Sequence, residues 1–404
     1  MSTHRFAALL ALLVASVVDS AGADKKIVLI AGGKSHGPGD HEFRAGCLLL
    51  QKSLAGVPGI KTFVYSNGWP SKVEGGNVVD DHAALDGAAA VLIYADGGGG
   101  HPLLVRDHSK VMEGLVKRGV GLGCAHYGVE IPSTNGGPQL LQWIGGHYEH
   151  AYSVNPMWIP NYQKFPNHPV ARGVKPFALL DEWYFNMRWP ADTKGLTHIL
   201  VDKPSDQVRN GPYVYPPGPY KHIQEAKGRE ETMMWTFERP DGGRGFGFTG
   251  GHKHVNWVND NQRKAVLNAL LWIAKVDVPA NGVESVVSPE ELALNLDPKG
   301  VPADAPNLTG AWNVTVQTQD ATYNPTFKLV HAGQNLIGDY KGGLGEAHVT
   351  GSVNQKNNEV RWKFEVEMQG EKTVCSYTGK IEDKNSMKGT MTLGEFEATW
   401  TAKR

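Results

Sequence analysis

The stretch "KKIVLIAGG" (residues 25–33) decides the fold, because it is a continuous apolar run that ends in glycines. A run without alternation is typical of a parallel strand buried on both faces. Similar strand patterns recur at 61–67, 89–100 and 120–126, and helical patterns separate them at 42–54 and 103–119. Strands that alternate with helices predict βαβ units, so we expect an α/β fold with a doubly wound, mostly parallel sheet.

Later segments extend this sheet and then give way to a second pattern. Further strands are expected at 196–204, 232–239 and 243–252, and a capped helix at 259–275 closes a domain that we place at 24–275. Residues 276–306 are rich in Pro, Gly and Asp and are interpreted as a linker. From 307 to 404, short segments with period-two alternation follow one another, and Gly, Asn or Asp separates them. This pattern predicts an all-β antiparallel barrel, either structural or ligand-gripping.

The first residues indicate export. A charged start, the apolar run "FAALLALLVASVV" and the small-residue pattern Ala21-Gly22-Ala23 follow one another. This order is typical of a secretory signal peptide, which we place at 1–23 with cleavage near Ala23; the alternative is a buried N-terminal helix. No other stretch is apolar enough to cross a membrane. We therefore expect a periplasmic or secreted protein.

Composition excludes several classes of partner and site. The formal net charge is −1, and no basic stripe exists, so nucleic-acid binding is not expected. The three cysteines, Cys47, Cys124 and Cys375, are far apart. A disulfide framework is not expected, because the chain is long enough to bury a large core. The oligomeric state stays open.

Polar side chains follow several predicted strands at the point where each ends. They are His36, His41 and Glu42 after the first strand, Asp96 and His101 after the third, His126 and Glu130 after the fourth, and His252 and His254 after the late strand. Ligands of open α/β sheets bind beyond the carboxyl ends of the strands. A single histidine there usually only bonds its own loop, but this convergence predicts a functional site. His126, at the tip of a small-residue turn, suits a general base or a metal ligand.

A second candidate site lies in "GGHYEHAY" (145–152). His147 and His150 are separated by three positions, which on a helix places both imidazoles on one side, as metal ligands require. The alternative is a loop whose histidines bond backbone carbonyls.

The stretch "LLDEWYFNMRW" (179–189) combines carboxylates with aromatic residues. Adjacent strand residues face opposite ways, so one of Asp181 and Glu182 faces the site and the other is solvated or capped. Trp183 and Tyr184 form either a sugar-stacking wall or part of the core.

Seven motifs in order give the chain from about Lys25 to Lys275 a family resemblance. They are "HGPGDHEF", "YADGGGGH", "GCAHYGVE", "GGHYEHAY", "NHPVARGV", "DEWYF" and "GFGFTGGHKH". This region resembles the ThuA-like (trehalose utilisation) family, which has the fold of class I glutamine amidotransferases. The short "GAW" at 310–312 resembles the first strand of lipocalin-like barrels.

The chain departs from the amidotransferase pattern at the catalytic positions. His126 stands where that fold carries its nucleophilic cysteine, and Cys124 lies before the turn. His252 matches the catalytic histidine, and His254 replaces the acid two residues later. A histidine cannot do the work of an acyl-forming thiolate, so glutaminase activity is not expected, although an amidase that uses Cys124 stays open.

The resemblance implies sugar metabolism, with a small sugar or glycoside as the partner. We expect a hydrolase or lyase acting on glycosides, including 3-keto forms, and the alternative is a non-catalytic carbohydrate-binding protein. The expected catalytic residues are His126, His252 and Glu182, with Glu42 as an alternative proton carrier. The expected substrate contacts are His36, Asp96, Glu130, Trp183, Tyr184 and His254. A divalent metal such as zinc is the expected cofactor, with His41, His147 and His150 as ligands.

Overall fold

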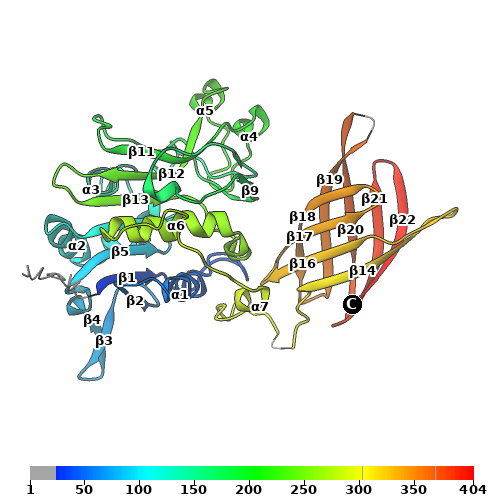
Figure 1. Cartoon of the computed structure of the whole chain (residues 1–404), viewed down its shortest axis with the longest axis horizontal. Helices are drawn as coiled ribbons and strands as arrows, with labels where there is room; N and C mark the ends of the chain where they lie inside the picture. Colours follow the sequence, from blue (N-terminus) through cyan, green and yellow to red (C-terminus); the bar gives the residue numbers. More distant parts are fainter. Residues whose placement is uncertain (1–23, 303, 369) are drawn as a thin grey trace, which may run out of the picture.

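The computed structural model describes residues 24–302, 304–368 and 370–404, so the expected signal peptide at 1–23 lies outside the described residues. Figure 1 shows an α/β unit beside a β-barrel, joined by a segment that carries a short helix. Within the described residues, every helix is too short or too polar to span a bilayer.

The α/β unit is built on a seven-stranded sheet with the order β11-β12-β13-β6-β5-β1-β2. The strands are β1 (Lys25–Ala31), β2 (Ile60–Tyr65), β5 (Ala88–Tyr94), β6 (Gly121–Ala125), β11 (Leu196–Asp202), β12 (Glu231–Glu238) and β13 (Arg244–Phe248). Strands β2, β1, β5, β6 and β13 are parallel neighbours, and β12 and β11 add an antiparallel edge. The predicted doubly wound, mostly parallel sheet is confirmed.

Helices cover both faces of this sheet because its strands are apolar on both sides (Figure 1). Ile27 and Leu29 of β1 belong to the core under α1 (Phe43–Leu54) and α6 (Asp260–Ile273). Val28 and Ile30 belong to the opposite core, under α2 (His108–Lys117) and α3 (Gly137–Trp143). All four β1 side chains are fully buried, which explains the unbroken apolar run.

Short elements complete the α/β unit. They are the hairpin β3 (Ser71–Glu74)–β4 (Asn77–Asp80), the pair β7 (Met157–Trp158)–β10 (Asp181–Glu182), the pair β8 (Asn161–Tyr162)–β9 (Phe177–Ala178), α4 (Asp206–Asn210) and α5 (Lys221–Glu225). Strand β10 matters most here, because it brings Glu182 to the polar edge of the main sheet.

Residues 276–302, in the region expected to be a linker, pack against the α/β unit. Helix α7 (Pro289–Leu292) begins with a capping box made by Ser288 and Glu291. Val283, Val287 and Leu292 join the core beneath α1 and α6. These apolar contacts explain why a stretch with a linker-like composition is ordered.

The C-terminal unit is a closed antiparallel barrel, as predicted. Its strands are β14 (Gly310–Gln317), β16 (Thr326–Ala332), β17 (Asn335–Gly342), β18 (Gly345–Asn354), β19 (Glu359–Met368), β20 (Glu371–Asp383), β21 (Ser386–Leu393) and β22 (Phe396–Lys403), with β15 (Thr322–Tyr323) as a short addition. Pairing of β14 with β22 closes it. Aromatic side chains such as Phe327, Trp362, Tyr377 and Trp400 pack together inside.

Candidate functional site

Four buried side chains meet beyond the carboxyl ends of the parallel strands. His126 directly follows β6, His252 follows β13, His41 lies on the loop after β1, and Glu182 ends β10. Each offers one donor atom, and these atoms all lie within 4.8 Å of one another. We call these four residues the histidine cluster.

Backbone geometry directs the imidazoles into this cluster. Strands β6 and β13 are parallel neighbours, so the residues that follow them meet at one edge. His126 and His41 have φ values of 51° and 48°. This left-handed conformation is uncommon for residues other than glycine, and it concentrates at functional sites. The tight turn predicted at His126 is therefore present.

A short antiparallel contact brings His41 beside His252. The His41 amide donates to the His252 carbonyl at 3.0 Å, and the His254 amide donates to the Gly39 carbonyl at 2.9 Å. Asp181 fixes the same segment, since its carboxylate accepts from the amides of Gly251 (2.9 Å) and Lys253 (3.1 Å). As predicted for this pair, Glu182 faces the site, and Asp181 is capped by the backbone amides of the loop.

Hydrogen bonds on the outer side of two rings decide which nitrogen faces the cluster. His126 Nδ1 lies 3.0 Å from the Thr249 carbonyl, which can only accept, so Nδ1 carries the hydrogen. His41 Nδ1 lies 2.9 Å from Asp96 Oδ1 and donates to it. In the neutral rings, both Nε2 atoms then carry lone pairs, and they lie only 3.0 Å apart. The Tyr184 hydroxyl lies 3.2 Å from His126 Nε2, and His252 Nδ1 lies 3.1 Å from His41 Nε2, so each lone pair has a possible donor. A metal cation between the two nitrogens would serve both lone pairs, and outer hydrogen bonds of this kind are typical of metal-ligating histidines.

Glu182 and His252 complete the donor set. His252 Nδ1 lies 2.6 Å from Glu182 Oε2, and its Nε2 lies 3.6 Å from Asp40 Oδ2. Asn155 donates to the other Glu182 oxygen at 2.7 Å, which leaves Oε2 directed at the cluster. Three imidazole nitrogens and one carboxylate oxygen are ligands that zinc prefers.

The charge of the cluster is concentrated on His252. Burial, together with the positive charge of His252, lowers the pKa of His126 to about 3. Burial and the neighbouring His126 and His252 hold the pKa of His41 well below its usual value. Burial also opposes charge on His252, but the carboxylates of Asp40 and Glu182 beside it outweigh burial and raise the pKa to about 10. Two neutral imidazoles beside carboxylates can hold a divalent cation that displaces the His252 proton.

The barrel supports this site through Asp40. Gln334 Nε2 donates to one Asp40 oxygen at 2.7 Å, and Asn335 Nδ2 donates to the other at 2.8 Å. A Cβ atom on Gly333 would lie 2.2 Å from the Gly39 amide nitrogen, so the turn between β16 and β17 fits closely against the loop. The barrel therefore fixes the carboxylate that faces His252.

Other predicted site residues border the cluster. The half-exposed ring of His36 stacks on His41 with the ring centroids 3.6 Å apart, and it lies 4.0 Å from Asp96. The Tyr184 hydroxyl lies 3.2 Å from His126 Nε2. Burial, with the charge of Glu182, raises the pKa of Glu130 to about 7.

The remaining predicted site residues lie elsewhere. Trp183 is fully buried in the core, with its Nε1 donating to the Leu179 carbonyl, so it does not form a sugar-stacking wall. His254 is fully buried in the 3₁₀ turn His254–Val258, which contacts α7. Glu42, the alternative proton carrier, is fully buried and paired with Lys299 at 3.1 Å.

The helix on which His147 and His150 would share a face is absent. Instead, His147 forms a bridge with Arg188, and its Nδ1 bonds the Tyr148 carbonyl. His150 is exposed and lies 3.9 Å from Glu130. Gly145, with a φ of 80°, interrupts helical geometry just before this stretch. Within the described chain, neither histidine belongs to a group of potential metal donors.

Sequence reasoning missed the residues that orient the cluster. Asp40 stands next to His41 in a motif that carries the resemblance, and this position could have indicated that it belongs to the site. Thr249 also stands in such a motif, three positions before His252, but it acts through its backbone carbonyl, which no residue type reveals. Asn155 lies outside all seven motifs. Cys124 is fully buried, and burial raises the pKa of its thiol, which opposes a nucleophilic role.

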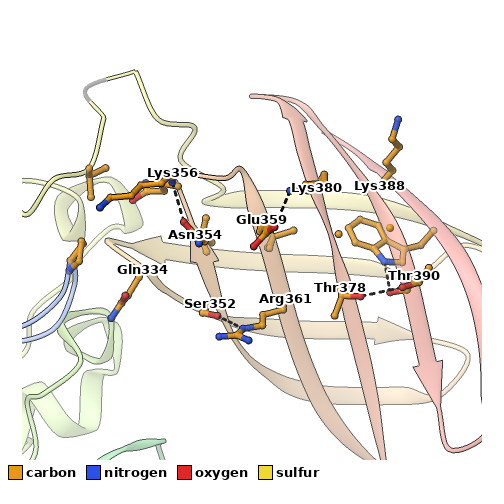
Figure 2. A pocket seen from close by; sticks show the side chains of 18 of the residues that line it. Gln334, Ser352, Asn354, Lys356, Glu359, Arg361, Thr378, Lys380, Lys388 and Thr390 are labelled. Atoms are coloured by element: carbon orange, nitrogen blue, oxygen red, sulfur yellow. Dashed lines mark hydrogen bonds and ion pairs between the residues drawn. The ribbon is translucent and has the colours of Figure 1, made fainter.

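A separate groove of about 1190 Å³ lies along the barrel and is also lined by Pro38 and by Lys299, Gly300 and Val301. Figure 2 shows its wall, where Lys380 pairs with Glu359 at 2.9 Å and Arg361 bonds Ser352. None of the clustered histidines lines this groove.

Comparisons with known proteins give a family and a few similar structures. No curated protein matches the chain in sequence. Two similar solved structures are putative ThuA-like proteins. The one from Bacteroides uniformis has 13% identity and a TM-score of 0.43, covering 63% of this chain and 94% of its own. The one from Parabacteroides merdae has 14% identity and a TM-score of 0.44, covering 67% of this chain and 99% of its own.

A further similar structure is a redesigned β-barrel, with 17% identity and a TM-score of 0.21, covering 24% of this chain and 90% of its own. The family model described as "ThuA: Trehalose utilisation" matches residues 51–273, which is more than half of the 404 residues. The matched range contains β6, β10 and β13, the strands that carry three of the four clustered side chains. The chain belongs to the ThuA (trehalose utilisation) family.

Proposed function

We propose that the protein is an exported, metal-assisted enzyme that cleaves glycosides, including 3-keto-glycosides, as a hydrolase or lyase. The observation that supports this most is the histidine cluster, whose donor atoms lie within 4.8 Å of one another. Hydrogen bonds outside the cluster orient His41, His126 and Glu182, which is how proteins prepare metal ligands. His41, His126, His252 and Glu182 would hold the ion.

The chemistry follows from the acidity of a sugar carbon next to a ketone. When bound, a divalent ion such as zinc supplies Lewis-acid stabilisation of an oxyanion. His36, the accessible imidazole at the edge of the cluster, takes the proton from C2, and the electron pair moves to the C3 carbonyl oxygen. The pair then returns to form the C1–C2 double bond as the bond from C1 to the leaving oxygen breaks. Glu130, with its pKa raised to about 7, gives that oxygen a proton, which completes the lyase reaction. A hydrolase would then add a water molecule across the C1–C2 double bond, with the hydroxyl on C1 and the proton on C2.

The first test is the metal content of the purified protein after loading with zinc and removal of free ion. We expect close to one equivalent in the wild type and a loss of most of it in His126→Ala. His348→Ala removes an exposed barrel histidine and serves as the matched control, which should keep the metal. A wild type without bound metal after loading would refute metal assistance.

The second test is turnover of 3-keto-trehalose with and without a chelator. Product that disappears with the chelator and returns with zinc supports the proposal. Saturable binding without product under any of these conditions would instead favour the carbohydrate-binding alternative.

A further inference from the structure

We propose that the cleft between the carboxyl ends of β1 and β5 binds a neutral sugar ring and is the substrate subsite of the histidine cluster. This inference rests on the proposed function, because it names the kind of molecule that the cluster would act on. The cleft has a volume of about 430 Å³, and its walls include Gly33 and Lys34 after β1, and Asp96 after β5. Trp69, Asp80 and Arg106 also line it.

The position of the cleft follows from the sheet topology. Strand β1 lies between β2 and β5, so the chain leaves β1 toward one edge of the sheet and later continues toward the other. Ligands of open α/β sheets bind at this point, where the strand order reverses. A Cβ atom on Gly32 would lie 2.7 Å from the Ala95 Cα, so the two loops touch at the base of the cleft.

Asp96 joins the cleft to the histidine cluster. It lines the cleft, and its Oδ1 accepts from His41 Nδ1 at 2.9 Å and from the Ser35 hydroxyl at 2.9 Å. Asp96 is 39% exposed, whereas His41 is 1% exposed. A molecule in the cleft can therefore contact the carboxylate that orients a clustered imidazole.

Contacts among the side chains around Trp69 hold this part of the cleft in one arrangement. The His108 ring stacks on Trp69 with the ring centroids 4.1 Å apart and the planes 9° from parallel. His108 Nε2 lies 2.9 Å from Asp80, and Arg106 lies 2.7 Å from the other Asp80 oxygen. Trp69 Nε1 also donates to His82 at 3.0 Å. This wall is preorganised, which lowers the cost of ordering it around a ligand.

The lining chemistry suits a neutral molecule with many hydroxyls. Asp80 and Asp96 carry acceptors and Lys34 and Arg106 carry donors, so these four charges balance. Arg106 pairs with Asp80 and Lys34 bonds the Pro298 carbonyl, so no unpaired charge awaits an ionic ligand there. Hydroxyl groups can both donate and accept and so can bond to the remaining sites of both kinds, whereas an anion would gain no net attraction from balanced charges. The volume lies near the lower end of small-molecule sites, roughly 300–1,000 Å³, which fits one sugar ring.

Gly33 offers a steric test that leaves the fold intact. A Cβ atom there meets nothing within 4 Å, and the same holds for Gly56, which lies between α1 and β2 away from the cleft. Gly33→Leu should fill the cleft, and Gly56→Leu is the matched control. Arg106→Ala removes a donor from the wall, and Arg118→Ala, at the end of α2, is its control.

Binding of D-glucose, trehalose and D-glucose 6-phosphate is measured by ligand-observed NMR titration of the full chain. We expect the wild type and both controls to bind the neutral sugars, Gly33→Leu to bind at least tenfold more weakly, and Arg106→Ala several-fold more weakly. Unchanged affinity in Gly33→Leu, no binding of either neutral sugar to the wild type, or tighter binding of the phosphate ester would overturn the proposal.

Metal content, measured on the same samples, separates this inference from the proposed function. Metal should remain in all four variants, because none of them changes a clustered donor. If the protein holds no metal but still binds sugar, and Gly33→Leu blocks that binding, then the subsite is supported and metal assistance is refuted. Bound metal, together with equal sugar affinity in Gly33→Leu and Gly56→Leu, would refute the subsite and leave metal assistance intact.

Discussion

The buried ion pair between Lys299 and Glu42 should be among the most costly contacts to break. Their side chains are 2% and 0% exposed, and Lys299 Nζ lies 3.1 Å from Glu42 Oε1. Lys299 also donates to the backbone carbonyls of Gly37 (3.3 Å) and His41 (3.4 Å). The pair thus joins residues 276–302 to the loop that carries His41.

Replacing Lys299 by Met leaves the Glu42 carboxylate in the core without its cation. Glu42 keeps two backbone donors, the amides of Gly39 (2.9 Å) and Asp297 (2.7 Å), but no charge partner. Loss of one member of a buried pair costs about 3–5 kcal/mol, so we expect the free energy of unfolding to fall by that amount. Zinc affinity should also fall, because the loop that positions His41 loses its anchor.

Guanidinium unfolding followed by tryptophan fluorescence measures the change in the free energy of unfolding. The control is Lys117→Met, which breaks an exposed pair with Glu113 and should cost less than about 1 kcal/mol. The double variant Lys299→Met/Glu42→Gln should be more stable than Lys299→Met, since the unpaired charge is gone. A Lys299→Met variant as stable as Lys117→Met, or a double variant with purely additive losses, would refute the reasoning.

Two other predictions concern the barrel and the cysteines. His331 is buried, bonded to the Leu308 amide and the Gly333 carbonyl, and burial lowers its pKa to about 4. The unfolded chain takes up this proton near pH 6.5, so the stability of the barrel is complete above that pH and falls as the pH drops toward 4, by up to about 3 kcal/mol. Unfolding measured across this range should depend on pH less steeply in His331→Gln, and equal slopes would contradict the assignment. Cys124 is fully buried and burial raises its thiol pKa, so the native protein should not react with a thiol reagent at pH 8 until guanidinium is added. Cys124→Ala should retain turnover, and loss of activity in a folded variant would restore the thiol mechanism.

The fold was predictable because the burial of each helix or strand determines the spacing of its apolar residues. Unbroken apolar runs such as 25–33 mark strands covered on both faces, and period-two segments after residue 307 mark the barrel. The segment 276–306 was harder to interpret, since its few apolar residues lie among Pro, Gly and Asp. Val283, Val287 and Leu292 become informative only once the core that they enter is known.

The candidate site was only partly predictable, because its residues come from elements that lie far apart in the sequence. Parallel strands share a carboxyl edge, so the sequence alone determined that His41, His126 and His252 follow strands ending at one side of the sheet. Tertiary structure decided which side chains meet, which ring nitrogen faces inward and which carboxylate joins them. Glu182 arrives on a two-residue strand, and Asn335 bonds Asp40 across 295 positions of chain. Periodicity encodes burial within one element, whereas contacts between distant elements depend on how the chain packs, and no local pattern records them.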